Sequence, residues 1–203
     1  MKKVAMSAPL LKAFAIHESM RNTAAAPSTL MYVHYRPQET IWISPQQDRV
    51  TVIFSTIFDE ETDRVLGKVF LQEFADARRQ LSLQNAPQVL HSKDAPGEIR
   101  HLPEIAALED KDTGHHYVTF VLFPRHFAPG PPREIVLAQI PLFRDYLHYH
   151  VKCCKAYMHS RMRKRVAGFL KVLNRAKPEN LEQEKKLASG RAFRQSIAPP
   201  PRA

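Results

Sequence analysis

Apolar residues recur along the chain in five short strand-like runs and three longer helical ones. The short runs are rich in Val, Ile, Phe and Tyr and are bounded by Pro, Gly, Asn or Asp, which is typical of strands. They occupy residues 30–35, 40–44, 50–58, 87–92 and 116–123. The helical runs occupy residues 4–20, 59–81 and 134–177, with apolar residues three or four apart. This order, α-β-β-β-α-β-β-α, predicts an α+β layered domain with an antiparallel sheet covered by helices.

The first two helical runs each show a candidate core-facing side. In the first it consists of Met6, Leu10, Leu11 and Phe14, and in the second of Val65, Val69, Phe70 and Phe74. The acidic residues 59–63 suit the start of the second helix, because carboxylates stabilise the positive end of the helix dipole. Residues 93–113 are polar and interrupted by Pro and Gly, so we predict a long loop there.

The third helical run predicts one long helix over residues 134–177, which Pro141 either starts or kinks. We expect residues 1–178 to form a single domain that ends in this helix, followed by a mobile polar tail over 179–203. An apolar stripe runs along the helix and should be buried against a sheet or a partner. Its residues are Tyr146, His150, Cys154, Met158, Met162, Phe169 and Leu173.

Charge is distributed very unevenly along the chain. Of 203 residues with a net charge of +10, residues 1–143 hold 15 Lys and Arg against 16 Asp and Glu, whereas residues 144–203 hold 15 against 4. On the long helix, five basic residues share one face, rotated by roughly a third of a turn from the apolar stripe. A solvated face that keeps the protein soluble is one interpretation. Like charges repel by about 0.2–0.5 kcal/mol per neighbouring pair, which favours an acidic partner. The five residues are Arg161, Lys164, Arg165, Lys171 and Arg175.

Motifs that would indicate catalysis, a cofactor or a metal are absent from the sequence. No phosphate-binding glycine loop, HExxH, CxxC or GxSxG pattern occurs. His115 and His116 should point to opposite faces of a strand, and His148 and His150 should not share a helix face. We therefore expect no metal, no cofactor and no enzymatic activity, and favour a binding or structural protein.

Two adjacent cysteines, Cys153 and Cys154, cannot form a disulfide framework, which favours a reducing, cytosolic setting. We expect at least one of them to pack in the core. No apolar run approaches the roughly 20 residues of a membrane-spanning helix.

Several long motifs resemble subunit 2 of the actin-related protein 2/3 complex, the 34 kDa subunit family. They include residues 48–80, 86–91, YVTFVLFPRHF at 117–127, FRDYLHYHVKCCKAYMHSRMRKRV at 143–166, FLKVLNRAKP at 169–178 and SGRAFR at 189–194. The resemblance extends over most of residues 30–195 and matches the second of the two tandem α+β domains of that family.

The resemblance implies a structural role in branched actin nucleation, in the cytoplasm and cytoskeleton. The apolar stripe would pack against the long helix of subunit 4, and the actin-related subunits would be further partners and the site of nucleotide hydrolysis. Attachment to the side of the mother actin filament would fall to Arg161, Arg163, Lys164, Arg165, Lys171 and Arg175.

Two other binding functions remain open for the basic helix. It could bind nucleic acid through phosphates, although few aromatic residues lie between its charges to stack on bases. It could also bind an anionic lipid surface, although no apolar edge beside the charges indicates insertion. Both are less favoured than an actin partner, and an enzyme is less favoured still.

Overall fold

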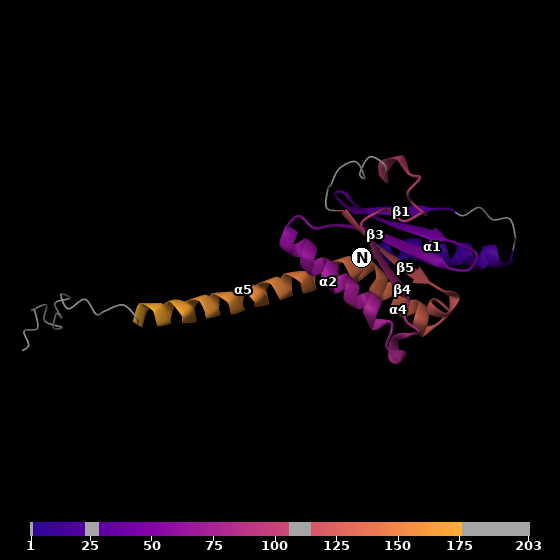
Figure 1. Cartoon of the computed structure of the whole chain (residues 1–203). Helices are drawn as coiled ribbons and strands as arrows, with labels where there is room; N and C mark the ends of the chain where they lie inside the picture. The colour runs from indigo at the N-terminus through magenta and orange to yellow at the C-terminus, as the bar shows by residue number, and fades with distance from the viewer. Residues whose placement is uncertain (1, 23–28, 106–114, 176–203) are drawn as a thin grey trace, which may run out of the picture. The chain divides into compact units, whose positions relative to one another are not determined.

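The structure, a computed structural model, describes residues 2–22, 29–105 and 115–175 (Figure 1). The chain divides into two compact units, Met1–Met158 and His159–Ala203, which are treated separately below. The first unit contains the sheet and the helices that cover it. Of the second, the described part is the C-terminal portion of one helix.

The elements confirm an α+β fold, with all five predicted strands close to their expected bounds. The strands form one antiparallel sheet in the order β1-β2-β3-β5-β4. In chain order the elements are α1 (Lys2–Asn22), β1 (Met31–Arg36), β2 (Glu39–Pro45), β3 (Val50–Ile57), α2 (Glu61–Ala77), η1 (Leu81–Leu83), β4 (Gln88–Ser92), β5 (His115–Leu122), η2 (Pro124–His126), α4 (Pro131–Gln139), η3 (Ile140–Leu142) and α5 (Phe143–Arg175).

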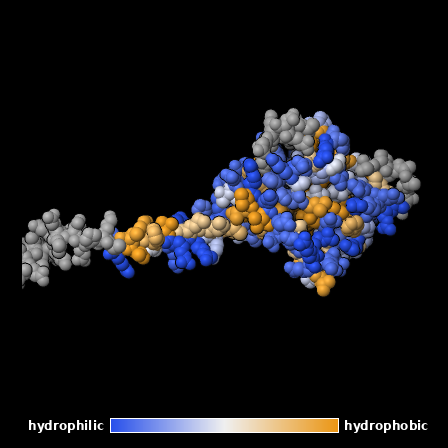
Figure 2. Space-filling model, in the orientation of Figure 1, coloured by the Kyte–Doolittle hydropathy of each residue, from blue (hydrophilic) through white to orange (hydrophobic). Residues whose placement is uncertain are grey.

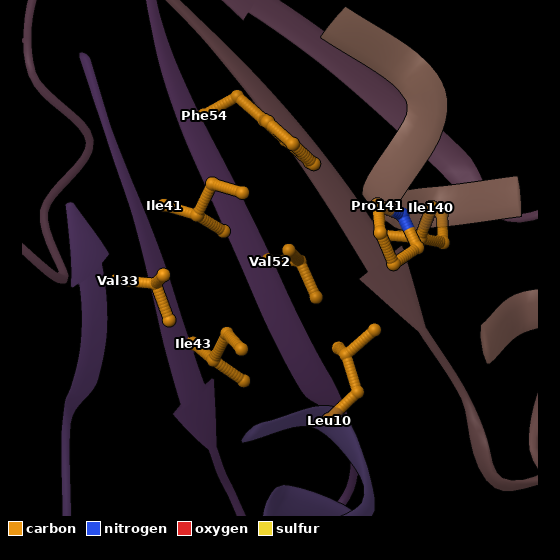
Figure 3. Close-up of a pocket in the computed structure, with 8 residues that line it drawn as sticks. All are labelled: Leu10, Val33, Ile41, Ile43, Val52, Phe54, Ile140 and Pro141. Carbon is orange, nitrogen blue, oxygen red and sulfur yellow. The ribbon is translucent and has the colours of Figure 1, made fainter. Parts of the chain in front are cut away.

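The predicted single helix over 134–177 is interrupted. The structure instead has α4, the 3₁₀ turn η3 and then α5. Pro141 causes the break, because it lacks an N–H and its ring clashes with the carbonyl four residues earlier. Figure 3 shows Ile140 and Pro141 facing Val52 and Phe54 of the sheet across a small apolar pocket. Residues 176–177, and the predicted tail over 179–203, lie outside the described residues.

The larger core lies on the sheet face that α1, α2, α4 and the first turns of α5 cover (Figure 1). Alternate strand residues point to this face, as the two-residue period of a strand requires. Val52 and Phe54 of β3 and Phe120 of β5 meet Leu10 and Phe14 of α1 in one buried cluster. The helical spacing predicted correctly that both α1 residues pack inward, but it was wrong for Leu11, which is 45% exposed.

The opposite face of the sheet holds a second core that the sequence did not predict. Trp42, Ile53 and Tyr117 point to it from three strands, and Ile99 and Ile105 cover them with no exposed surface. Both covering residues come from the segment predicted as a polar loop. Residues 93–102 are turns and bends, as expected of a loop, and a short helical stretch follows at 103–105. The burial of Ile99 and Ile105 was not predicted, because a few isolated apolar residues carry no periodicity for a sequence pattern to reveal.

Helix α2 packs through only part of the row predicted for it, since Phe70 and Phe74 lie against the core but Val65 and Val69 do not. Val65 and Val69 are each 56% exposed, whereas Gly67 and Leu71 are buried. The reason is Phe58, whose ring lies so close to Gly67 that a Cβ atom there would be 2.4 Å from its Cζ. The helix therefore turns its glycine toward the sheet and leaves both valines in solvent.

We expect Gly67→Ala to destabilise the first unit by about 1–3 kcal/mol, the range for an overpacked core. The clash with Phe58 should outweigh the roughly 1 kcal/mol that alanine adds to helix propensity. Urea unfolding followed by the fluorescence of Trp42, the single tryptophan, measures the effect.

Gly168→Ala is the matched control, because no described atom lies within 4 Å of its added Cβ. It should increase helicity without shifting the Trp42 transition. Identical unfolding midpoints for wild type and Gly67→Ala would contradict the packing argument.

Candidate interaction site on helix α5

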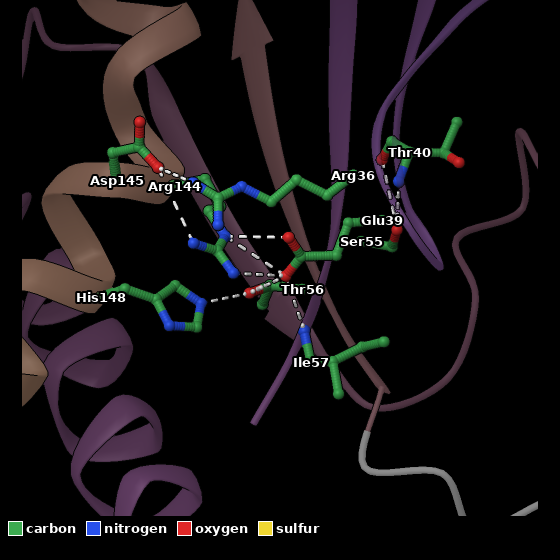
Figure 4. A network of polar contacts seen from close by, with 9 residues as sticks. All are labelled: Arg36, Glu39, Thr40, Ser55, Thr56, Ile57, Arg144, Asp145 and His148. Carbon is green, nitrogen blue, oxygen red and sulfur yellow. Dashed lines mark hydrogen bonds and ion pairs between the residues drawn. The ribbon is translucent and has the colours of Figure 1, made fainter. Parts of the chain in front are cut away.

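A buried ion pair holds the first turn of α5 against the sheet. The side chains of Glu39 and Arg144 are only 4% and 15% exposed, and Arg144 Nε lies 2.9 Å from Glu39 Oε2 (Figure 4). Glu39 Oε1 also accepts hydrogen bonds from the backbone N–H of Ile57 and from Thr56 Oγ1. A buried carboxylate is tolerated when donors surround it in this way.

The same network extends along α5 to His148. His148 Nε2 lies 2.9 Å from Thr56 Oγ1, and its ring stacks on Phe58. Burial lowers the pKa of His148, and Arg144 lowers it further. A neutral ring that donates through Nε2 to Thr56 fits this geometry, with Thr56 donating in turn to Glu39. Nearby, burial raises the pKa of Tyr35, and Glu39 adds to the shift.

A separate histidine pair joins β4 to β5. His91 Nε2 lies 3.1 Å from His116 Nδ1, and the two rings stack. Burial and, to a smaller extent, the neighbouring His91 together lower the pKa of His116 to about 4. The two rings are therefore bonded to each other across neighbouring strands. Among the described residues, no group of three or more His, Cys, Asp or Glu is placed to hold a metal ion.

The rest of α5 within the first unit is fixed by aromatic, aliphatic and ionic contacts. Phe143 packs edge-on against Phe54, Phe74 and Phe120, and Leu147 and Val151 are buried. Lys155 forms ion pairs with Glu60 and Asp63 at the start of α2. The acidic run therefore begins a helix, as predicted, and also binds a lysine of α5, a contact that no sequence pattern indicated.

Three residues of the predicted partner-packing stripe lie in this first part of α5. Tyr146 and His150 contact Phe70 of α2, with Tyr146 half exposed. Cys154 is exposed, as is Cys153, so the expectation that one cysteine packs in the core was wrong. On a helical wheel Cys153 falls outside the arc of the buried row of Phe143, Leu147 and Val151. Cys154 falls within that arc, but it lies beyond Val151, the last buried residue of α5.

Beyond Lys155, the apolar side chains of α5 are exposed to solvent. Phe169 is 65% exposed, and Met158, Met162 and Leu173 are also exposed. Val166 and Leu170 extend the same side of the helix. We call the row formed by Met158, Met162, Val166, Phe169, Leu170 and Leu173 the apolar row. So many large apolar side chains along one helix face are typical of a protein contact surface.

A basic face lies beside the apolar row in the second unit. Arg161, Lys164, Arg165, Lys171 and Arg175 are all exposed and fall within an arc of about 120° on the helix. Figure 2 shows hydrophilic and hydrophobic side chains on separate sides of this part of α5. The sixth predicted residue, Arg163, lies outside this arc, on another side of the helix. No Asp or Glu occurs between residues 146 and 175, so no acidic side chain in this stretch of the helix offsets these charges.

None of the described helices combines the length and apolarity needed to cross a membrane. Because its large apolar side chains are exposed, the apolar row is a candidate for contact with another protein, with the basic face beside it. Two separate surfaces on one helix allow two different contacts.

Comparison with known proteins identifies the family. Residues 1–180 match the family model described as Arp2/3 complex, 34 kD subunit p34-Arc. This chain belongs to that family. It is 56% identical to actin-related protein 2/3 complex subunit 2 of Schizosaccharomyces pombe over 175 residues, which is 86% of this chain and 53% of the relative. It is 40% identical to the subunit 2 of Dictyostelium discoideum over 197 residues, or 97% of this chain and 63% of the relative.

The family membership confirms the resemblance seen in the motifs. The chain spans between one half and two thirds of the length of these relatives. The matched region includes the sheet, the buried Glu39–Arg144 pair and the whole described part of α5.

Proposed function

We propose that this chain is a structural subunit of an Arp2/3 complex in the cytoplasm and cytoskeleton, with no enzymatic activity of its own. The observation that carries the proposal is the exposed apolar row of α5 in a chain of the 34 kD subunit family. A row of this kind is unfavourable in water, and a partner helix would bury it. Nucleotide hydrolysis would belong to the actin-related subunits.

The apolar row is the proposed contact with the long helix of subunit 4. Burying a large apolar side chain contributes about 1.5–3 kcal/mol, so the row can hold two chains together. Tyr146, His150 and Cys154 would extend this contact toward the first unit. The pair would then form the core to which the other subunits attach.

The basic face is the proposed contact with the side of the mother actin filament. An acidic filament surface would attract Arg161, Lys164, Arg165, Lys171 and Arg175 and orient the complex on it. Arg163 would contribute from another side of the helix. Because these charges are exposed, the attraction should weaken as salt is raised.

Co-expression with a candidate subunit 4 tests the proposal. The two chains should elute together from a tag on one of them, and the pair should pellet with actin filaments at physiological salt. If the two chains do not form a pair, the proposal that this chain binds subunit 4 without further subunits is contradicted. Pelleting with anionic liposomes, or binding to nucleic acid of any sequence, in place of filaments would favour the alternative functions of the basic face.

Charge reversal of the five-residue basic face to glutamate should weaken filament co-sedimentation of the assembled pair by at least tenfold. The physical reason is the loss of attraction along one side of α5 and its replacement by repulsion. The measurement is the bound fraction against filament concentration at physiological salt, with pairing checked by gel filtration.

The control variant makes the same change in net charge at exposed basic residues of the first unit. It should pellet like wild type if position on α5 matters rather than total charge. Equal pelleting by the basic-face variant and wild type would remove the basic face from the mechanism. The control residues, none of which lies on α5, are Lys12, Arg21, Lys68, Arg79 and Lys93.

A further inference from the structure

A second candidate interaction site lies within the first unit and uses none of the residues discussed for α5. An apolar groove of about 380 Å³ opens between the end of α2, the η1–β4 segment, β5 and α4. Phe74, Leu83, Val89, Phe120 and Ile135 supply most of its apolar lining. This volume is within the range of natural binding pockets, which start at about 300 Å³.

Apolar side chains at this end of the molecule are unusually exposed. Leu81, two residues before the lining residue Leu83, is 85% exposed, and Ile135 of the groove itself is 61% exposed. Together with the groove they form an apolar surface that continues outside the hollow. Exposed apolar surface around a hollow is typical of a site that receives a side chain of another protein.

The charged residue in the lining of the groove indicates which kind of group would bind there. Arg78 lines the groove, and its Nε is buried without a hydrogen-bond partner in the part of the chain that the structure describes. A buried donor that lacks an acceptor is unfavourable, and a carboxylate is the acceptor that matches the geometry of a guanidinium. The neighbouring Arg79 differs, since it is exposed and pairs with Asp76 at 3.3 Å.

The surroundings of Arg78 are electropositive. Burial lowers the pKa of the nearby His126, and the positive charges of Arg125 and Arg78 lower it further. His126 is bonded within the chain, with Nε2 2.9 Å from the carbonyl oxygen of Asn85 and Nδ1 accepting from the N–H of Phe123. His126 does not line the groove, and Arg78 is the charged residue of the lining that can bind an anion.

We propose that this groove binds a segment of a partner protein in which a bulky apolar side chain lies next to a carboxylate. The apolar side chain fills the groove between α2 and α4, and the carboxylate accepts from Arg78. The site is independent of the proposed contacts of α5, so either can fail without the other. It gives the chain a third contact surface, on the folded domain.

The probe is a fluorescein-labelled peptide, Glu-Asp-Glu-Trp-Leu-Glu-Asp-Glu, with a counterpart in which every acidic residue is lysine. Fluorescence anisotropy with the full chain at physiological salt should show binding of the acidic peptide and at least tenfold weaker binding of the lysine peptide. Arg78→Gln should weaken acidic-peptide binding about tenfold, and Ile135→Ser should weaken it severalfold by making the wall of the groove polar.

Arg79→Gln is the matched control, because it removes the same charge one residue away and should change the affinity less than twofold. The charge-reversed basic face of α5 should likewise leave binding unchanged, which excludes capture of the peptide by that helix. Equal weakening by Arg78→Gln and Arg79→Gln, or no binding of the acidic peptide, overturns the proposal. Binding of free indole-3-propionate without binding of the peptide also overturns it, in favour of a small-molecule pocket.

Discussion

Replacing Met162, Phe169 and Leu173 with glutamate is expected to abolish co-purification with a subunit 4 partner. All three side chains are exposed in the chain alone, so the substitutions remove no contact within the first unit. In the proposed pair each would be buried, at about 1.5–3 kcal/mol per side chain. Their loss, with three charges placed in an apolar interface, should weaken pairing at least a thousandfold, since about 1.4 kcal/mol is a factor of ten.

Ser160, Ala167 and Asn174 provide the matched control for this experiment. On the helical wheel they lie in the arc between the apolar row and the basic face and belong to neither. Changing all three to glutamate adds the same charge to the same helix and should preserve co-purification. The Trp42 unfolding transition should be unchanged in both triple variants. Retention of the pair by the Met162, Phe169 and Leu173 variant would show that the apolar row is not the interface.

Glu39→Gln is expected to cost about 3–5 kcal/mol of the free energy of unfolding. The carboxylate is almost completely buried, and it is the only acidic group within ion-pair distance of Arg144 in the described part of the chain that is itself buried. A glutamine in its place leaves the Arg144 guanidinium buried without a compensating charge. It also weakens the hydrogen bonds from Thr56 and Ile57, so the first turn of α5 loses its attachment to β3. Urea unfolding followed by Trp42 fluorescence measures the loss.

Two further variants separate the buried charge from other effects. The double variant Glu39→Gln with Arg144→Met should recover much of the lost stability, because no unpaired charge then remains buried. Asp48→Asn breaks the exposed ion pair with Arg49 and should cost no more than about 1 kcal/mol. A loss below about 1 kcal/mol for Glu39→Gln would contradict the proposed role of this pair in holding α5.

Local patterns predicted the elements of this fold well but were less reliable about which residues face the core. The five strands and the helix over 143–175 follow from periodicity and from Pro and Gly punctuation. The side of α2 that faces the core does not follow from these patterns, because Gly67 packs against Phe58, a residue outside the helix. Similarly, Ile99 and Ile105 became core residues only through contact with Trp42, Ile53 and Tyr117, which come from three separate strands.

The sequence by itself determined the order of the elements, the concentration of positive charge after residue 143, the two faces of α5 and the family. Each of these depends on neighbours in the chain or on the residues themselves, which a linear pattern records. Only the tertiary structure decided which charges are buried and paired, and where the surface is hollowed. Glu39 and Arg144 are 105 residues apart, and the groove beside Arg78 is assembled from four separate elements. Such long-range contacts depend on how the chain closes on itself, and no local periodicity encodes them.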